Sequence, residues 1–194
     1  MQKLETTLTQ ELDKLEDVGN ARIHSSSFII QNHTIFLEKC EIAFNKISNK
    51  FNTKNTTEIY KEYNLFSVMA GCPYFFRLFK ELQKIIRVYC LNDSSLWMQA
   101  WLNYHTENEV LEVLGWHDHL WPYHGYVSID PHNTVTEFKE FKIINKVGNI
   151  YIGPGYHKHR VIVKENYLRP RITIGFDVTN QIKHFPDHYS LLPI

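Results

Sequence analysis

The residues best suited to chemistry in this sequence are histidines, which are concentrated in its second half. Two of them, His117 and His119, are separated by a single residue, Asp118. Alternate residues of a β-strand point to the same face, so histidines with this spacing converge if the segment is extended. The pair would then form one half of a metal site, and Asp118 would point away from it.

A second histidine pair, His157 and His159, follows a glycine-rich turn that contains Pro154. An apolar run begins directly afterwards, so the pair is expected at the start of a strand. One histidine from this strand would complete a set of three ligands and leave metal positions open for a substrate or dioxygen. Each pair alone is also compatible with a histidine-rich surface loop. The two pairs together favour a metal site.

A third group of chemically capable residues lies in segment 171–178, where polar and apolar residues alternate. Arg171, Thr173 and Asp177 are expected on one face of a strand. An arginine that faces into a small barrel is costly unless it meets an anion. Its planar guanidinium, with the Thr173 hydroxyl as a second donor, suits a carboxylate. The alternatives are an internal ion pair, for instance with Asp177, and an arginine in water at the barrel mouth.

Short strands after residue 95 are expected to position these residues. Their predicted ranges are 96–104, 109–114, 125–129, 141–144, 149–152, 160–163 and 171–178. Turn residues such as glycine, proline and asparagine separate them, and no long helical pattern intervenes. Such a series is typical of an antiparallel sandwich or barrel.

The sequence before residue 92 has helical periodicity instead. Leucines at positions 4, 8, 12 and 15 predict a first helix that stops near Gly19. An apolar stripe over residues 36–51 predicts a second helix, and residues 52–57 read as a polar connection. A third helix is expected over residues 73–89, with Pro73 in its first turn. The pattern therefore predicts an α+β protein whose helices brace a β-barrel or jelly roll.

Composition narrows the possible functions of this 194-residue chain. It is 43% hydrophobic and carries 21 basic and 21 acidic residues, so it can form a core, and nothing favours nucleic acid as a partner. The three cysteines form no CxxC pair, which disfavours a disulfide framework. No signal-peptide pattern and no apolar run of about 20 residues is present, so we expect a cytoplasmic protein without a membrane partner.

In order along the chain, these three groups resemble the core of the iron(II)- and 2-oxoglutarate-dependent oxygenases. That family has a strand-end His-x-Asp, a distal histidine shortly after a proline-containing turn, and then an Arg-x-Ser/Thr strand. The similar elements here are 117–119, 154–161 and 171–173. Segment 101–103 is also similar to small bacterial and phage members. The resemblance covers residues 96–178.

The resemblance implies that residues 93–194 form a catalytic core with a cupin-like double-stranded β-helix fold. This core is expected to pack on a helical scaffold region, residues 1–92, within one compact domain. It implies that His117, His119 and His159 hold Fe(II), and that Arg171 and Thr173 bind the distal carboxylate of the cosubstrate 2-oxoglutarate. The implied reaction consumes dioxygen, releases succinate and CO2, and hydroxylates a small-molecule or peptidyl substrate. The sequence leaves that substrate and the oligomeric state open.

Two ligand positions depart from the family pattern or are ambiguous in it. His119 occupies the position at which the family usually has its carboxylate ligand. Some family members also have a histidine there. Strand alternation favours His119, whereas a β-bulge would turn Asp118 inward in its place. For the distal ligand, the apolar residues that follow favour His159 over His157.

Two other functions fit the same fold. With His124 in the position that usually holds glutamate, the pattern is similar to cupin metal motifs, which implies a three- or four-histidine dioxygenase or isomerase without 2-oxoglutarate. A metal-stabilised binding module without turnover is the third interpretation, because the aromatic residues 116, 121, 123, 126 and 156 could hold a sugar or peptide.

Overall fold

The computed structural model describes residues 15–91, 95–106, 115–181 and 189–194. In chain order its elements are β1 (Leu15–Val18), β2 (Ala21–Ser25), α2 (Ser27–Gln31), α3 (His33–Phe51), α4 (Leu65–Val68), α5 (Pro73–Cys90), β3 (Trp97–His105), β4 (Tyr123–Asp130), β5 (Thr134–Phe138), β6 (Lys142–Ile144), β7 (Asn149–Pro154), β8 (His159–Val163), β9 (Arg171–Thr179) and β10 (Leu192–Pro193). None of the helices in these ranges is long and apolar enough to span a bilayer.

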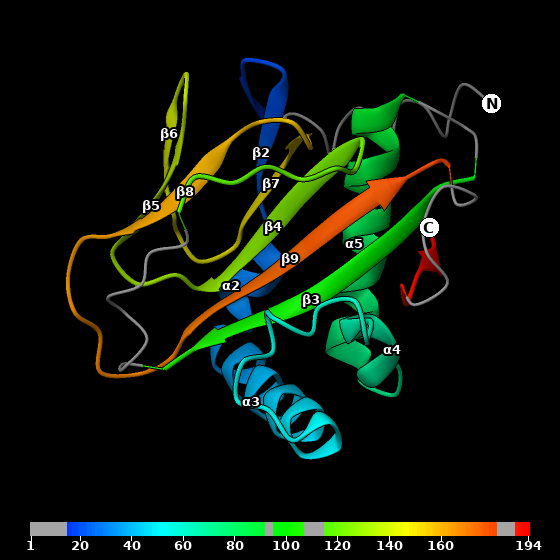
Figure 1. Ribbon diagram of the computed structural model, residues 1–194, viewed down its shortest axis with the longest axis vertical. Coiled ribbons are helices and arrows are strands. Elements are labelled where there is room, and N and C mark those ends of the chain that lie inside the picture. The colour runs from blue at the N-terminus through cyan, green and yellow to red at the C-terminus, as the bar shows by residue number, and fades with distance from the viewer. Residues whose placement is uncertain (1–14, 92–94, 107–114, 182–188) are drawn as a thin grey trace.

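The strands form two antiparallel sheets. The larger sheet has the order β1-β2-β7-β4-β9-β3-β10, and the smaller one has the order β6-β5-β8. Between β4 and β9 the chain moves repeatedly from one sheet to the other (Figure 1). This alternation is that of a jelly roll, so the predicted α+β fold with helices on a double-stranded β-helix is confirmed.

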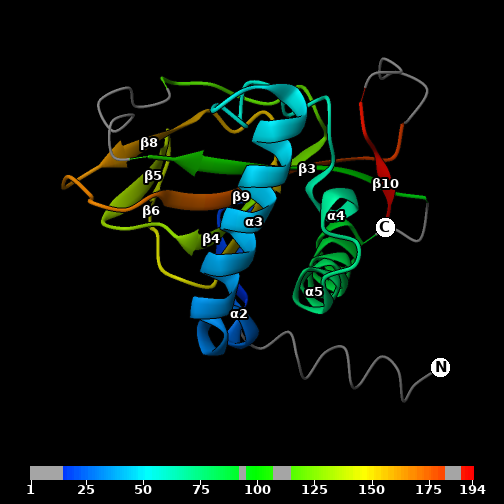
Figure 2. The ribbon, with the colours of Figure 1, turned by 90° about the horizontal axis from the view of Figure 1, so that it is seen from below.

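The helices cover the outer face of the larger sheet (Figure 2). Helix α5 begins at Pro73, whose missing N–H is not needed in the first turn, and ends before Leu91 in a left-handed conformation. It buries Phe75, Leu78 and Leu82 at three- and four-residue spacing, as expected for one packed face. Helix α3 does the same through its own apolar stripe. These contacts hold the larger sheet in place from outside.

Strand β9 separates the helix-packed core from the space between the sheets. Its apolar residues, among them Ile174 and Phe176, pack with the helices. The alternate residues, from Arg171 through Thr173 to Asp177, line a pocket on the opposite face. The predicted alternation of this strand is therefore confirmed.

Two parts of the sequence prediction differ from the structure. The helix expected to stop at Gly19 is replaced, from Leu15 onward, by the β1–β2 hairpin, and positions 4, 8 and 12 lie outside the described residues. Gly19 has φ of +63°, which suits a two-residue hairpin turn, and β2 then pairs with β7. Strands from before residue 92 thus belong to the same sheet as later ones. Strand β5 was not predicted, and segment 109–114 lies outside the described residues.

Candidate metal centre

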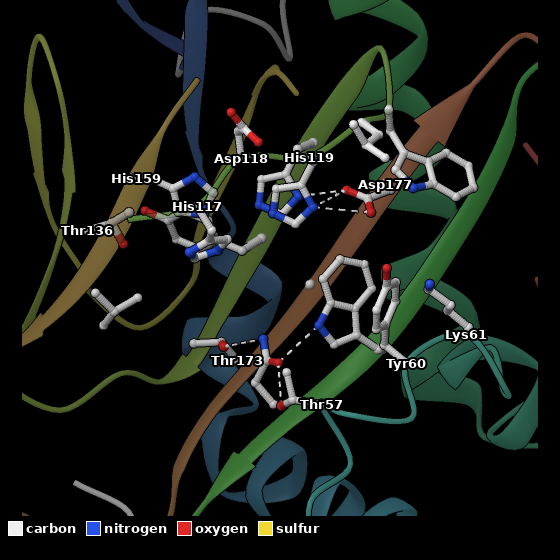
Figure 3. Close-up of a pocket in the computed structure, with 18 of the residues that line it drawn as sticks. Thr57, Tyr60, Lys61, His117, Asp118, His119, Thr136, His159, Thr173 and Asp177 are labelled. Atoms are coloured by element: carbon white, nitrogen blue, oxygen red, sulfur yellow. Dashed lines mark hydrogen bonds and ion pairs between the residues drawn. The ribbon is translucent and has the colours of Figure 1, made fainter. Parts of the chain in front are cut away.

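A cavity of about 780 Å³ lies between the two sheets. Strand β9 forms one wall, β3 and β4 contribute neighbouring side chains, and segment 117–122 lies across it. Figure 3 shows the histidines on one side of this pocket, with Thr173 and Asp177 on the β9 wall. The residues that the sequence favoured for metal and cosubstrate binding all line this one cavity, whereas the alternative distal ligand His157 does not.

His117, His119 and His159 come together in the cavity, and each offers a nitrogen within 4.8 Å of the others. Backbone pairing brings them there, because His117 N–H donates to His159 O at 3.0 Å and His159 N–H donates to His117 O at 2.9 Å. Next to this bridge, His119 N–H donates to the Gly155 carbonyl at 2.9 Å. A side chain at Gly155 would collide with the Trp121 carbonyl, so only glycine permits this approach.

Each of these three imidazoles has its Nδ1 next to an oxygen that can only accept. The partners are the Gly115 carbonyl for His117 at 2.8 Å, the Asp177 carboxylate for His119 at 3.1 Å, and the His157 carbonyl for His159 at 3.0 Å. Nδ1 must therefore carry the proton, which leaves the lone pair of Nε2 available to a metal. Nε2 of His119 is buried without a hydrogen-bond partner, as expected of a nitrogen that binds a metal.

The electrostatic environment favours the neutral form of His117 and His159. Burial, followed by the nearby histidine His124, lowers the pKa of His159 to about 2. Burial also lowers the pKa of His117. Neutral imidazole is the form that binds Zn, Fe, Cu or Ni, so neither ligand has to lose a proton at neutral pH. Three imidazole donors with an adjoining cavity can hold one divalent transition metal and leave positions open.

His124 and Asp177 form a second layer beside His119. The His124 ring stacks on His119 with 3.5 Å between centroids, and its Nδ1–H donates to Asp177 at 2.8 Å. Burial raises the pKa of Asp177, but its hydrogen bonds from the two histidines outweigh this and lower it overall. Sequence reasoning placed Asp177 on the inner face but missed this contact, because its two partners lie more than 50 residues away in the chain.

The two ambiguous residues lie away from the ligand cluster. Asp118 is exposed, and its carboxylate is 3.8 Å from Lys158 Nζ. His157 places its Nδ1 3.4 Å from the Tyr151 hydroxyl. Neither belongs to the group of converging nitrogens that His117, His119 and His159 form.

Arg171 and Thr173 lie on the same β9 wall of the pocket as Asp177, at the start of the strand. Arg171 is only 6% exposed, and it forms a hydrogen bond with the Tyr167 side chain. Burial lowers the pKa of its guanidinium, and the contact with Tyr167 opposes that change. Asp177 lies six residues further along β9, which is about 20 Å at the usual rise per residue of a strand. The ion pair between Arg171 and Asp177 that the sequence left open as an alternative is therefore not formed.

The hydroxyl of Thr173 is oriented by Asn103. The Asn103 amide oxygen accepts from Trp101 Nε1 at 3.0 Å and from Thr57 Oγ1 at 2.9 Å. The amide nitrogen of Asn103 therefore faces Thr173 and donates to its Oγ1 at 3.1 Å. Since Thr173 Oγ1 accepts this bond, its own proton is available to another acceptor in the pocket.

Comparisons with known proteins support the fold. No protein-family model matches the chain, and no curated protein sequence matches it. Among solved structures, the non-heme monooxygenase ThoJ in complex with nickel superimposes with a TM-score of 0.53 and 11% identity over 96% of this chain and 79% of its own. The non-heme alpha-ketoglutarate-dependent epimerase SnoN from nogalamycin biosynthesis superimposes with a TM-score of 0.51 and 8% identity, over 92% of this chain and 82% of its own. At these identities the likeness establishes a shared jelly-roll fold.

Proposed function

We propose that this protein is a non-haem iron(II), 2-oxoglutarate-dependent oxygenase that hydroxylates an organic substrate. The observation that carries the proposal is the arrangement of one cavity. Three histidine nitrogens converge in it, and the buried Arg171 lies on the same wall and takes part in none of the ion pairs that the described residues form. The likeness in fold to ThoJ and SnoN supports this function.

His117, His119 and His159 are the residues that would hold the iron. Their Nδ1 contacts fix the ring orientations before the metal arrives, so little conformational freedom is lost on binding. Bound there with 2-oxoglutarate and dioxygen, iron(II) supplies the oxidative chemistry, with succinate and CO2 as coproducts. The chain itself supplies geometry and a cavity that limits access of water.

Arg171 and Thr173 would bind the distal carboxylate of 2-oxoglutarate. The guanidinium can donate two parallel hydrogen bonds, and the Thr173 proton that Asn103 leaves available can donate a third. A buried guanidinium beside an open cavity is strongly stabilised by an anion. This pair of donors favours a cosubstrate with a carboxylate over a metal site that needs none.

A cupin-type metal dioxygenase or isomerase is the second candidate. The observation in its favour is His124, whose ring lies 5.1 Å from that of His159 and 3.5 Å from that of His119. A fourth imidazole at this position could take part in binding the metal. Such an enzyme would have no use for Arg171 and Thr173 as a carboxylate site.

An anaerobic titration tests the proposal. 2-Oxoglutarate is added to the Fe(II)-loaded protein while the metal-to-ligand absorption band is followed, and succinate release is then measured in air. We expect a saturable band and release of succinate even without a second substrate, at a low rate. A protein that binds iron but gives no band would contradict the oxygenase proposal and favour the cupin alternative.

A further inference from the structure

The pocket has a second chemically distinct end, opposite Arg171. Along the inner face of β9 the residues run from Arg171 through Thr173 and Gly175 to Asp177 and Thr179. Trp101 lies directly over Gly175, where any side chain would collide with its indole ring. The Arg171 end is assigned to 2-oxoglutarate above, so the space towards Thr179 is available to the substrate that is hydroxylated.

Aromatic rings line this second end. Tyr60 contacts Trp101 with 5.2 Å between centroids, and Trp121 contacts Tyr189 at the same distance. Tyr60 and Tyr189 lie 6.3 Å apart in an edge-to-face arrangement and share a hydrogen bond. All four line the cavity, which gives it a continuous wall of π-surface. Such a wall favours ligands with a flat or ring-shaped apolar part.

Lys61 supplies the charge at this end. Its Nζ lies 5.5 Å from the Tyr60 ring centroid and 5.4 Å from that of Tyr189, so two cation–π contacts hold the ammonium at the pocket lining. None of the ion pairs that the described residues form includes Lys61. Figure 3 shows Lys61 beside Tyr60, on the side of the pocket away from His117 and His159.

The acidic residues that line the cavity do not neutralise this charge. They are Asp118, which is exposed near Lys158, and Asp177, which accepts hydrogen bonds from His119 and His124. The cation at the aromatic end is thus left to attract a ligand, and a cationic ligand would be repelled there.

We infer that the substrate of this enzyme is an organic anion with a ring, whose ring lies against Tyr60 and Trp121 and whose negative group pairs with Lys61. The inference rests on the proposed function, because it assigns the remaining space in that site. A carboxylate is the probe used to test it. Trp101 connects this end of the pocket to the histidines, because its ring stacks on that of His119 with 6.1 Å between centroids.

Matched ligands measured by tryptophan fluorescence and calorimetry test the inference. The probes are phenylacetate, its neutral analogue phenylacetamide, and the ring-free hexanoate, added to Ni(II)-loaded protein with saturating 2-oxoglutarate to fill the Arg171 end. We expect phenylacetate to bind more tightly than both analogues. Lys61→Met should weaken phenylacetate about 10-fold, the loss expected for one partly exposed charge-assisted hydrogen bond, and leave phenylacetamide unchanged.

Two further variants separate the contributions. Lys46→Met, an exposed lysine on α3 outside the pocket, should bind phenylacetate as the wild type does. Tyr60→Leu should abolish the preference for phenylacetate over hexanoate. Equal affinities for phenylacetate and phenylacetamide, no binding of phenylacetate at millimolar concentration, or an unchanged ratio in Lys61→Met would each overturn the inference.

Comparison of these titrations with the 2-oxoglutarate titration of the Fe(II)-loaded protein distinguishes this inference from the proposed function. If metal and 2-oxoglutarate bind but phenylacetate does not, the substrate class is wrong and the oxygenase proposal stands. If phenylacetate binds through Lys61 but no 2-oxoglutarate band forms, the oxygenase proposal fails and the anion site stands.

Discussion

His119 donates its Nδ1–H to the carboxylate of Asp177, with 3.3 Å between Nδ1 and Oδ2. The bond fixes the histidine tautomer and directs Nε2 into the cavity. It also brings a buried negative charge next to the proposed metal site, whose three ligands would all be imidazoles. In the proposed metal site, Asp177 would compensate in part for the carboxylate that a two-histidine, one-carboxylate site contains.

Asp177→Asn should therefore weaken metal binding about 10- to 100-fold, the usual cost of losing such a partner. The amide retains the size of the side chain but can accept from only one of the two histidines, so the loss reports the charge together with one hydrogen bond. Competitive titration of Co(II) with a chelator measures the dissociation constant, and the visible Co(II) spectrum reports ligand geometry. Asp118→Asn is the matched control, and an equal effect of both substitutions would show that Asp177 has no special role.

His119→Ala should lose most of its metal, whereas Asp118→Ala should retain it. The reason is that His119 Nε2 is buried without a partner, while Asp118 is exposed near Lys158. Metal content after desalting decides between them. The opposite pattern would mean that the segment rearranges on metal binding and uses a carboxylate ligand.

The same logic applies to the second histidine pair. His159→Ala should abolish stoichiometric Fe(II) binding and His157→Ala should not, because only His159 reaches the other two ligands. Thermal unfolding of both metal-free variants checks that the jelly roll survives. Full iron content in His159→Ala would exclude it as the distal ligand.

Arg171→Ala should weaken 2-oxoglutarate binding without changing iron affinity. Removal of one partner of a buried charge pair costs about 2–5 kcal/mol. At about 1.4 kcal/mol per tenfold change, this is about a 30-fold to several-thousand-fold loss. Arg171→Lys should recover only part of it, since lysine cannot form the two-pronged contact. The anaerobic titration measures both, and wild-type affinity in Arg171→Ala would refute the assignment.

The metal-free protein should lose stability as the pH falls from 7 towards 4. Burial, followed by the charge of Arg171, lowers the pKa of His105 to about 4, and burial followed by His119 does the same for His124. In the unfolded chain these imidazoles titrate near 6.5, so below that pH the unfolded state binds more protons and the free energy of unfolding decreases. Urea unfolding at several pH values measures the slope. His105→Gln should make it shallower, and an unchanged slope would contradict this account.

Local pattern was enough to predict much of this fold. The apolar spacing that begins at Pro73 indicated α5, and the alternation after Arg171 gave both faces of β9 correctly. The β1–β2 hairpin was missed because the Gly19 turn signal suits a helix end and a hairpin alike. Pairing of β2 with β7, a partner distant in the chain, decides between them.

The sequence by itself determined which residues could do chemistry: two histidine pairs and an inward-facing arginine, each readable from spacing because strand geometry is local. Only the tertiary structure decided that His117, His119 and His159 converge while Asp118 and His157 do not. It alone revealed the Asp177, Asn103 and Lys61 contacts, because these join residues from separate strands and loops. Such contacts depend on how the two sheets pack against one another. The periodicity of a single segment does not encode the distance between residues on different segments.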